Sequence, residues 1–468
     1  MSDKYDITIG LEIHAGLNSK TKVFCSCENK FGAEPNTLVC PVCLGLPGTV
    51  PSINKECVML AMKAGLMTNC KIHEDTTWER KNYFYPDLTK GYQISQIPAP
   101  ISYDGWVELD SGKKIGISDI HLEEDTGKLV HMDGKTYIDY NRCGIPLIET
   151  VTKPDISSAD EAVEFLEKLR STYIYGNVAL CKMEQGGMRC DVNLSVKPKG
   201  STVFGNKVEM KNLGSFRAVK QAIEYEAERQ MKLLDEGKTV IEETRKWDEK
   251  DGVNIAMRAK LASGVYRGFL DPDIPTVHIP HEVVVECLNN LPITPDKLKV
   301  IYKEKYNLPD YDISIISAKK ELVKFFEDCI KLYPNAKDLS NWIMGELLRN
   351  VKNDICITPE NFVKIINLVD SKKISRVNAV PLIAKVMETN EDPETLAKKM
   401  DMINLTLSKE EIEKIICGIL EKNPKAIEDY KVIPDKITTF ITGQVMKETK
   451  GKADFVLVKK VIGEHFSK

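Results

Sequence analysis

MRCDVNLSV, residues 188–196, decides the fold of the N-terminal part of the chain, because apolar and polar residues alternate along it without a break. A period of two is typical of a β-strand that is buried on one face only. The apolar face consists of Met188, Cys190, Val192, Leu194 and Val196, and the polar face of Arg189, Asp191, Asn193 and Ser195. DITIGLEIH, residues 6–14, alternates in the same way. We therefore predict two half-buried strands in these segments.

Turn and cap signals around these strands indicate an antiparallel sheet with helices set apart from it. Asp133-Gly134 supplies two positive-φ positions between the β-rich arms of LVHMDGKTYID, as a tight hairpin requires. A capping box at Ser158-x-x-Glu161 begins a helix that ends near residue 175. A second helix is expected over 215–237. Hairpins with segregated helices favour an α+β arrangement over repeated βαβ units.

The pattern of the sequence changes from strand-like to helical near residue 293. From Thr294-Pro295-Asp296 onward, nearly every segment has a helical period and few glycines. A second, softer boundary lies near 405, where INLTLSKEE restarts a helical pattern. The predicted organisation is a β-rich domain over 1–292, a helical domain over 293–405 and a small helical tail domain over 406–468.

Composition sets limits on the class of protein. The 468 residues include 65 Lys and Arg against 69 Asp and Glu, and 42% are hydrophobic, so a mainly disordered chain is excluded. No apolar run approaches the ~20 residues of a membrane span, and MSDKYDITIG is no signal peptide, so we expect a cytoplasmic protein. The net charge of −4 removes the signature of a strongly basic nucleic-acid binder but leaves room for a local basic patch.

Four of the 13 cysteines lie close together in the sequence, as Cys25-x-Cys27 and Cys40-x-x-Cys43. Paired soft ligands on two short turns suit a tetrahedral Zn²⁺ ion. Four thiolates would leave no open position, so this zinc would be structural. The alternative is a set of buried free cysteines, and an odd total in a chain of this size makes a disulfide framework unfavourable.

Acidic side chains gather on the polar faces of the predicted strands. Glu12 and His14 are two residues apart, about 7 Å along one strand. Further groups at strand ends or on polar faces are Glu124, Glu149, Asp191, Glu209 and Lys211. Such a set could hold Mg²⁺ beside phosphates, with Lys211 and Arg189 offsetting charge. The alternative is ordinary surface acids, since any large sheet exposes some, and no P-loop or dinucleotide-binding motif is present.

Two further segments combine cations with other signals. In RKNYFYPDLTKGYQ (80–93), aromatic residues such as Tyr83 alternate with cations such as Lys90, a pattern that can bind bases and phosphates. A Tyr-rich loop packed on the sheet explains it equally well. The tail carries eight lysines against four acids over 431–468, and these lysines include Lys447, Lys450 and Lys452. They could bind an RNA backbone or simply be solvated.

Read together, long motifs in fixed order closely resemble the B subunit of the tRNA-dependent amidotransferase, the GatB family. The matching stretches are IGLEIHAGL, FGAEPNT, RKNYFYPDLTKGYQISQ, HLEEDTGK, NRCGIPLIETV, MRCDVNLSV, EMKNLGSF, ETRKWDE, NWIMGELL and GQVMKETKGKA. They extend over essentially the whole chain. The resemblance implies a β-rich catalytic cradle, a helical domain and a tail that contacts tRNA.

The resemblance also implies an activity and its partners. A GatB-type protein works in a heterotrimer with an amidase, the A subunit, which frees ammonia from glutamine, and with a small C subunit. It binds mischarged Glu-tRNA(Gln) or Asp-tRNA(Asn) and uses ATP to phosphorylate the side-chain carboxylate. Ammonia then displaces the phosphate to give the amide. The expected activity is therefore that of a carbon–nitrogen ligase with glutamine as nitrogen donor.

The resemblance places the magnesium ligands of the family on Glu12, His14, Glu124 and Glu149. With the other strand residues, the expected catalytic set is Glu12, His14, Glu124, Glu149, Asp191, Glu209 and Lys211, and the expected nucleotide-binding set is Arg189, Lys211, Tyr83 and Lys90. The predicted cofactors are ATP, Mg²⁺ and a structural Zn²⁺ on the four cysteines.

One segment departs from the family pattern. At 257–275, where the family has a pattern like MRSKE…DYRYFPEPDLP, this chain has Val265 in place of the acid, Gly268 in place of a tyrosine and Leu270 in place of a proline. A divergent copy with altered tRNA choice or reduced activity is one alternative. A zinc-stabilised tRNA-binding scaffold without its own chemistry is another. A metal-dependent hydrolase using Glu12 and His14 is less favoured, because no H-E-x-x-H motif is present.

Overall fold

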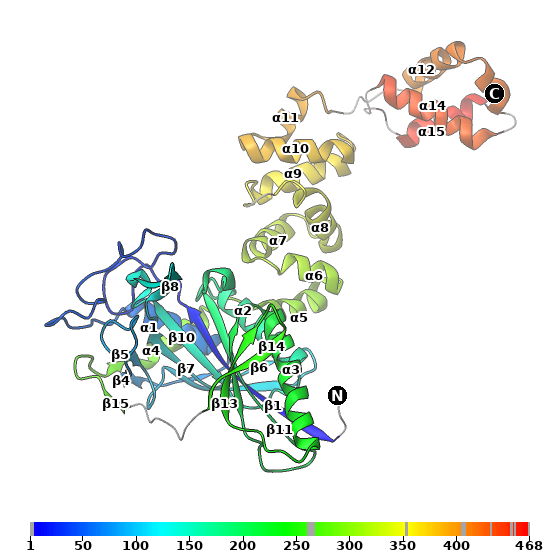
Figure 1. The fold of residues 1–468 in the computed structure, drawn as a ribbon. Coiled ribbons are helices and arrows are strands. Elements are labelled where there is room, and N and C mark those ends of the chain that lie inside the picture. Colours follow the sequence, from blue (N-terminus) through cyan, green and yellow to red (C-terminus); the bar gives the residue numbers. More distant parts are fainter. Residues whose placement is uncertain are drawn as a thin grey trace. The chain divides into compact units, whose positions relative to one another are not determined.

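A computed structural model describes residues 4–259, 267–351, 354–403, 409–430, 433–449, 453 and 455–466. The chain divides into two units, Met1–Thr294 and Pro295–Lys468. All the described strands belong to the first unit, and the described part of the second is helical, which confirms the predicted α+β class with a helical C-terminal region (Figure 1).

Nine strands of the described first unit form one sheet in the order β14-β13-β12-β11-β1-β10-β7-β6-β2. These strands are β1 (Tyr5–Gly16), β2 (Lys71–Ile72), β6 (Ser102–Glu108), β7 (Lys114–Glu124), β10 (Pro146–Thr152), β11 (Met188–Pro198), β12 (Val208–Leu213), β13 (Glu243–Asp248) and β14 (Val253–Ala259). All neighbours pair antiparallel except β12 and β13. That parallel pair follows from helix α3 (Phe216–Asp235), which joins the two strands as a crossover.

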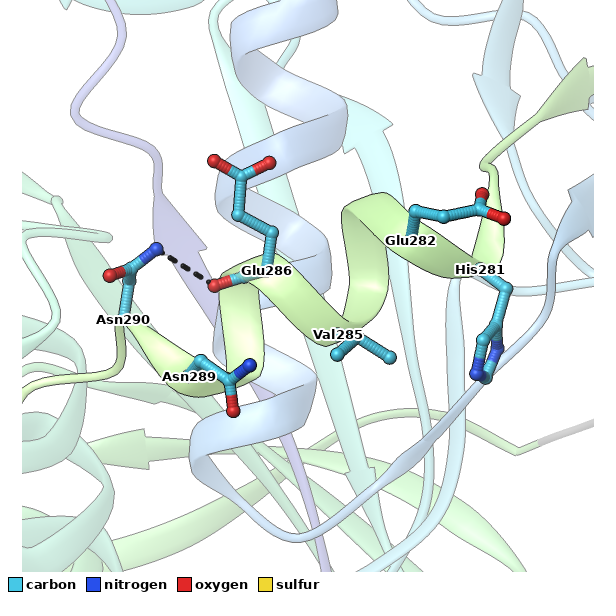
Figure 2. Close-up of a pocket in the computed structure, with 6 residues that line it drawn as sticks. All are labelled: His281, Glu282, Val285, Glu286, Asn289 and Asn290. Carbon is cyan, nitrogen blue, oxygen red and sulfur yellow. Dashed lines mark hydrogen bonds between the residues drawn. The ribbon is translucent and has the colours of Figure 1, made fainter.

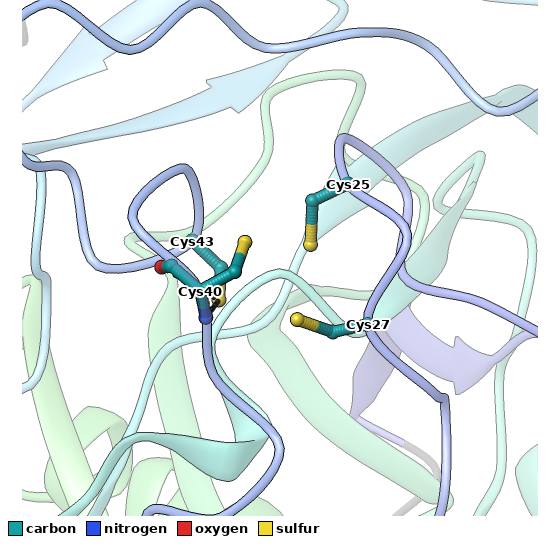
Figure 3. Close-up of side chains that lie close together, drawn as sticks. All are labelled: Cys25, Cys27, Cys40 and Cys43. Atoms are coloured by element: carbon teal, nitrogen blue, oxygen red, sulfur yellow. Dashed lines mark hydrogen bonds between the residues drawn. The ribbon is translucent and has the colours of Figure 1, made fainter.

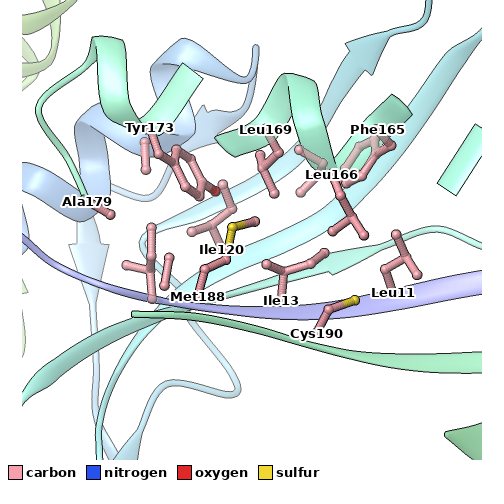
Figure 4. Packing of buried hydrophobic residues seen from close by; sticks show 14 of the residues in the cluster. Leu11, Ile13, Ile120, Phe165, Leu166, Leu169, Tyr173, Ala179, Met188 and Cys190 are labelled. Atoms are coloured by element: carbon pink, nitrogen blue, oxygen red, sulfur yellow. The ribbon is translucent and has the colours of Figure 1, made fainter. Parts of the chain in front are cut away.

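The two sequence segments that alternate most cleanly are neighbours at the centre of this sheet. β1 pairs with β11 over most of its length and with β10 on its other edge. Leu11, Ile13, Met188 and Cys190 point to one face, where they pack under the helix α2 (Ala159–Tyr175) (Figure 4). The apolar face of the predicted strands is thus the core, and their polar face looks the other way.

Both predicted helices of this unit are present and capped by serine. The Ser158 side chain accepts a hydrogen bond from the backbone N–H of Glu161, and Ser215 accepts one from that of Ala218. The Glu161 carboxylate accepts from the backbone N–H of Ser157 instead of Ser158, so the capping box is displaced by one residue. A third helix, α1 (Lys55–Met67), also contributes to the core, and α4 (His281–Asn289) lies near the end of the unit.

Smaller sheets complete the first unit. β15 (Arg267–Leu270), β4 (Glu79–Asn82) and β5 (Tyr92–Ser95) form one, β16 (Val277–His278) and β3 (Asp75–Thr76) another, and β8 (Lys128–Met132) and β9 (Lys135–Asp139) a hairpin. The predicted turn of that hairpin is confirmed, since Asp133 and Gly134 have φ of 53° and 71°. Short helical turns η1 (Tyr140–Arg142) and η2 (Met183–Gln185) precede β10 and β11.

The described helices of the second unit follow one another along the chain. They are α5 (Pro295–Tyr306), α6 (Asp310–Ile316), α7 (Lys320–Leu332), α8 (Ala336–Trp342), the π-helix η3 (Ile343–Leu347), α9 (Pro359–Asp370), α10 (Arg376–Thr389), α11 (Pro393–Lys399), α12 (Lys409–Lys422), α13 (Lys425–Tyr430), α14 (Pro434–Glu448) and α15 (Phe455–Phe466). Helices α12–α15 share an apolar cluster of their own. The three-domain boundaries at 292 and 405 stay a prediction. Among the described helices, none has the length and apolar character to cross a membrane.

Candidate functional site

Polar side chains from four neighbouring strands line up in one row across the sheet. Strand register places His121 of β7 opposite Glu149 of β10, Glu149 opposite His14 of β1, and His14 opposite Arg189 of β11. Residues that are directly opposite in adjacent strands point to the same face. This row therefore lies on the polar face of the sheet, away from the core.

The first cluster on this face is formed by His14, Glu123 and Glu149. The Nε2 atom of His14 lies 3.2 Å from Glu123 Oε1 and 3.4 Å from Glu149 Oε2. One ligand atom from each residue lies within 4.8 Å of the others. Two carboxylates and one imidazole that converge on a point are a donor set suited to a divalent cation such as Mg²⁺.

The electrostatics of this cluster favour a positive charge at its centre. Burial alone would lower the pKa of His14 and His121, but hydrogen bonds to carboxylates raise both to about 10. The same contacts hold the pKa of Glu149 below its ordinary value, against the opposing effect of its burial. The protonated imidazoles of His14 and His121 therefore balance the charge of these carboxylates. A divalent cation could take the place of the His14 proton, because a histidine binds metal in its neutral form.

A second cluster of three carboxylates, Glu12, Asp191 and Glu209, lies on the same face. Oxygen atoms from the three residues also lie within 4.8 Å of one another. The ammonium of Lys211 contacts two of them, at 2.5 Å from Asp191 Oδ2 and 2.8 Å from Glu209 Oε1. Asn193 donates to Glu12 at 2.9 Å.

Charge couples the two clusters. Burial, followed by the nearby charge of Glu149, raises the pKa of Glu12, while its hydrogen bond from Asn193 acts in the opposite direction. For Lys211, burial would lower the pKa, and the adjacent carboxylates raise it well above its usual range. The ammonium of Lys211 is therefore held charged between acids.

The four cysteines predicted as zinc ligands converge, as Figure 3 shows. Their sulfur atoms all lie within 4.8 Å of one another. A tetrahedral ion with Zn–S bonds of about 2.3 Å needs sulfurs roughly 3.8 Å apart, so the cluster fits zinc. Hydrogen bonding from Cys25 lowers the pKa of Cys43 to about 4, against the effect of burial, and the charge of Lys22 contributes to this shift.

Lys22 provides a second observation that favours an anionic cysteine cluster. Its residue is 0% exposed, and its ammonium donates to the carbonyl oxygen of Leu38 at 2.8 Å and to Cys43 Sγ at 3.6 Å. A buried ammonium is costly unless an anion faces it. A zinc ion with four thiolates, which carries a net negative charge, would supply that anion.

Comparison with known proteins agrees with the resemblance found in the sequence. The model of the GatB/GatE catalytic domain matches residues 7–285, and that of the GatB domain matches residues 324–466. The chain belongs to the GatB family. Proteins named as the B subunit of an aspartyl/glutamyl-tRNA(Asn/Gln) amidotransferase are similar to it from end to end. Those of Caldicellulosiruptor bescii and Thermoanaerobacter pseudethanolicus are 45% and 44% identical over 99% of this chain and all of theirs, and that of Clostridium tetani is 40% identical over 99% of each.

The resemblance read from the sequence is thus confirmed, and both carboxylate clusters and the cysteine cluster fall within the GatB/GatE catalytic match. The structure differs from the expected magnesium set in one ligand and in one grouping. Glu123, and not Glu124, accompanies His14 and Glu149, and Glu12 lies with Asp191 and Glu209.

The physical reason for the first difference is strand alternation, which turns adjacent residues of β7 to opposite faces. Glu124 instead forms an ion pair with Lys90 and accepts a hydrogen bond from the backbone N–H of Ile94 at 3.0 Å. Lys90, predicted to bind nucleotide, is thereby held next to the cysteine loop, where Thr89 donates to the carbonyl oxygen of Cys43 at 2.9 Å. The roles of Glu124 and Lys90 in this GatB-family chain stay predictions.

The other predicted residues lie as follows. Arg189 lies opposite His14 of the first cluster, and its guanidinium is paired with Asp125 at 3.1 Å. Tyr83 follows β4 in the small sheet and is half-buried. Lys447 is exposed in the last turn of α14, whereas Lys450 and Lys452 lie outside the described residues.

The segment that departs from the family pattern lies partly in β15. Gly268 pairs with Lys81 and Leu270 with Glu79 of β4, while Val265 lies outside the described residues. Just after β15, Asp271 and Asp273 bind Arg80 at 2.8 and 2.7 Å.

The sequence did not predict these ion pairs between Arg80 and the two aspartates, although the segments DPDIP and RKNYF that contain them are both present in it. It also did not predict His121 and Asp119 beside the first cluster, where His121 Nδ1 lies 2.8 Å from Asp119 Oδ1. The pattern S-D-I-H-L-E (118–123) indicates these residues, because it places Asp119, His121 and Glu123 at alternate positions of one strand.

A surface hollow over α4 shares no residue with these clusters. It is lined by His281, Glu282, Val285, Glu286 and Asn289 of that helix and by Asn290, its C-cap residue (Figure 2). Since a single helix forms it, and Val285 is the one apolar side chain in it, it lacks the converging walls of a binding pocket.

Proposed function

We propose that this chain catalyses the ATP-dependent amidation of mischarged Glu-tRNA(Gln), Asp-tRNA(Asn) or both, as the B subunit of an amidotransferase. The observation that carries the proposal is the pair of adjacent clusters, His14–Glu123–Glu149 and Glu12–Asp191–Glu209, on the polar face of the nine-stranded sheet. The names of relatives that are 40–45% identical over the whole chain support the same activity.

The chemistry explains why such a protein needs acids and cations and no nucleophile. Ammonia cannot displace an oxygen from a carboxylate until that oxygen becomes a good leaving group, and phosphorylation by ATP provides one. Phosphoryl transfer depends mainly on positioning and on neutralising charge. Mg²⁺, when bound, would supply that neutralisation and polarise the phosphate oxygens.

The chain's own residues would divide this work. The two clusters would hold the metal ions, with His14, Glu123 and Glu149 in one and Glu12, Asp191 and Glu209 in the other. Lys211, fixed between carboxylates, and Arg189, fixed by Asp125, would face the phosphates as permanent cations.

The four cysteines would hold a structural Zn²⁺, since four thiolates close its coordination sphere. The convergence of the sulfurs and the buried Lys22 support this part of the proposal. The cysteine loop lies against the segment of Lys90, whose ammonium meets Glu124.

Partners are part of the same proposal. The relatives are named as B subunits, so we infer an assembly with an amidase, the A subunit, together with a small C subunit. Mischarged tRNA would contact the C-terminal helices, where Lys447 is exposed. The site of action would be the cytoplasm, where aminoacyl-tRNA is used.

The decisive experiment reconstitutes the complex and compares Glu149→Gln with Glu108→Gln. The first change keeps the volume of the side chain but removes a charge from the first cluster, and the second alters an exposed acid at the end of β6. Glu149→Gln should abolish tRNA-dependent ATP cleavage and amide formation and leave glutamine hydrolysis measurable. Full amidation by Glu149→Gln would refute the role of the cluster.

The same assay separates this function from a zinc-stabilised tRNA-binding scaffold. A scaffold would bind tRNA but would consume no ATP in response to mischarged tRNA. Wild-type complex that cleaves ATP only when Glu-tRNA(Gln) or Asp-tRNA(Asn) is present eliminates the scaffold.

A further inference from the structure

His121 and Asp119 form a supporting pair beside the first cluster. His121 Nε2 lies 3.3 Å from Glu149 Oε2, and its other ring nitrogen lies 2.8 Å from Asp119 Oδ1. The side chains of His121 and Asp119 are 12% and 26% exposed. Both nitrogens of the ring are therefore engaged by carboxylates, and the ring cannot turn without losing both contacts.

The shape of β7 puts this pair on the polar face. Up to Ile117, the odd-numbered residues of the strand face the core, but from Ile120 onward the even-numbered ones do. The pairing with β10 shifts by one residue at this point, where Val151 faces Asp119 and Thr152 faces Ile117. A β-bulge at the intervening Ser118 thus changes the phase of the strand. Bulges commonly re-aim side chains next to active sites.

We propose that Asp119 and His121 are positioning residues that hold Glu149 in place as a metal ligand, an inference that rests on the proposed metal cluster. Glu149 Oε2 is contacted by two imidazoles, those of His14 and His121. His14 is itself one of the converging ligands, so its Nε2 atom cannot serve both the metal and Glu149. His121 lies outside that ligand set, and its bond to Glu149 can persist when the metal is bound.

This arrangement matches the general behaviour of metal centres. Groups that hydrogen-bond to a ligand orient it and raise the affinity of the site, and their loss weakens metal binding by about 10- to 100-fold. Asp119 has the corresponding role toward His121, because it fixes the ring that contacts Glu149. The effect of either substitution should therefore appear first as a weaker affinity for metal.

The test measures binding of Mn²⁺ alone to the purified full chain, by the loss of the free-ion signal in electron paramagnetic resonance. His121→Gln and Asp119→Asn should each weaken binding at the first cluster by about 10- to 100-fold. His131→Gln, at an exposed position of β8, is the matched control and should leave the affinity unchanged. In the assembled enzyme, the two variants should raise the Mg²⁺ concentration needed for half-maximal rate and recover toward the wild-type kcat at high Mg²⁺.

The outcomes separate this inference from the proposed function. Loss of Mn²⁺ binding in Glu149→Gln together with unchanged affinity in His121→Gln and Asp119→Asn would overturn the positioning role alone. A wild-type chain that binds no Mn²⁺, or a Glu149→Gln chain that binds it normally, would overturn the metal cluster itself. A merely structural role for His121 would lower the unfolding temperature without moving the Mg²⁺ dependence, and that result would also overturn the inference.

Discussion

Replacing Lys22 by methionine tests whether the cysteine cluster is a charged metal centre. Lys22 is completely buried, and its ammonium donates to the Leu38 carbonyl oxygen and to Cys43 Sγ at 2.8 and 3.6 Å. Methionine has a similar length and no charge. In the zinc-loaded chain, the substitution removes charge-assisted hydrogen bonds, each worth about 1.5–3 kcal/mol. We therefore expect the free energy of unfolding to fall by about 3 kcal/mol.

The zinc-free chain should respond differently. Without the metal, the Lys22 ammonium faces the single thiolate of Cys43, whose pKa is held near 4, and no longer the larger negative charge of a four-thiolate zinc centre. This weaker pairing offsets less of the cost of burying the ammonium. Removing it should change the free energy of unfolding by no more than about 1 kcal/mol. The difference between the two forms, about 2 kcal/mol, must by linkage equal the loss of zinc binding energy. At 1.4 kcal/mol per tenfold, Lys22→Met should bind zinc roughly 30-fold more weakly.

The assay combines urea unfolding with a measurement of metal release. Three of the four tryptophans, Trp78, Trp106 and Trp247, lie in the first unit, so fluorescence reports mainly on the part of the chain that contains the cluster. Zinc transfer to a chromogenic chelator gives the affinity directly, and the exposed Lys20→Met is the control. Equal destabilisation of the zinc-loaded and zinc-free chains by Lys22→Met would refute the reasoning.

Three other substitutions test separate features. Gly45→Ala should destabilise the chain by more than Gly48→Ala. Both glycines have positive φ, so both substitutions cost about 1–2 kcal/mol of backbone strain, but a Cβ at Gly45 would also lie 2.7 Å from Lys90 Cγ, whereas one at Gly48 meets nothing within 4 Å. Equal urea midpoints for the two variants would contradict the contact. Asp104 is paired with two lysines, which lower its pKa from 3.8 to about 2. Its stabilisation is therefore complete above about pH 5 and is lost as the pH falls through 2. Asp104→Asn should have a lower urea midpoint than wild type at pH 7 and approach it near pH 2, and a gap that does not narrow would be evidence against the pairing. Lys447→Glu should weaken tRNA binding and reduce its salt dependence, and an unchanged dissociation constant across salt concentrations would remove Lys447 from the interface.

Strand faces were predictable from the sequence because a half-buried strand has a period of two. The polar sets of β1 and β11, including Glu12, His14 and Asp191, lie on one face as the alternation indicates. Which residues lie opposite one another was not predictable, because strand register depends on contacts between segments far apart in the chain. The pairing of His14 with Glu149 joins residues 135 positions apart.

The choice between Glu123 and Glu124, by contrast, can be read from the sequence. Two adjacent acids point to opposite faces, so the phase of β7 decides which one joins the cluster. That phase changes at Ser118, where the buried residues shift from Ile117 to Ile120. The spacing of three between these isoleucines is visible in the sequence and indicates the bulge. Read from Ile120 and Leu122, the alternation selects Glu123.

The position of β1 makes the two carboxylate clusters parts of one site. β1 lies between β10 and β11, and it contributes His14 to one cluster and Glu12 to the other. These residues are two apart on one strand, which fixes their spacing at about 7 Å with little freedom. A shift of β1 by one residue against either neighbour would turn both side chains into the core and bring Leu11 and Ile13 to the polar face. The apolar packing of Leu11 and Ile13 under α2 therefore holds the register on which both clusters depend.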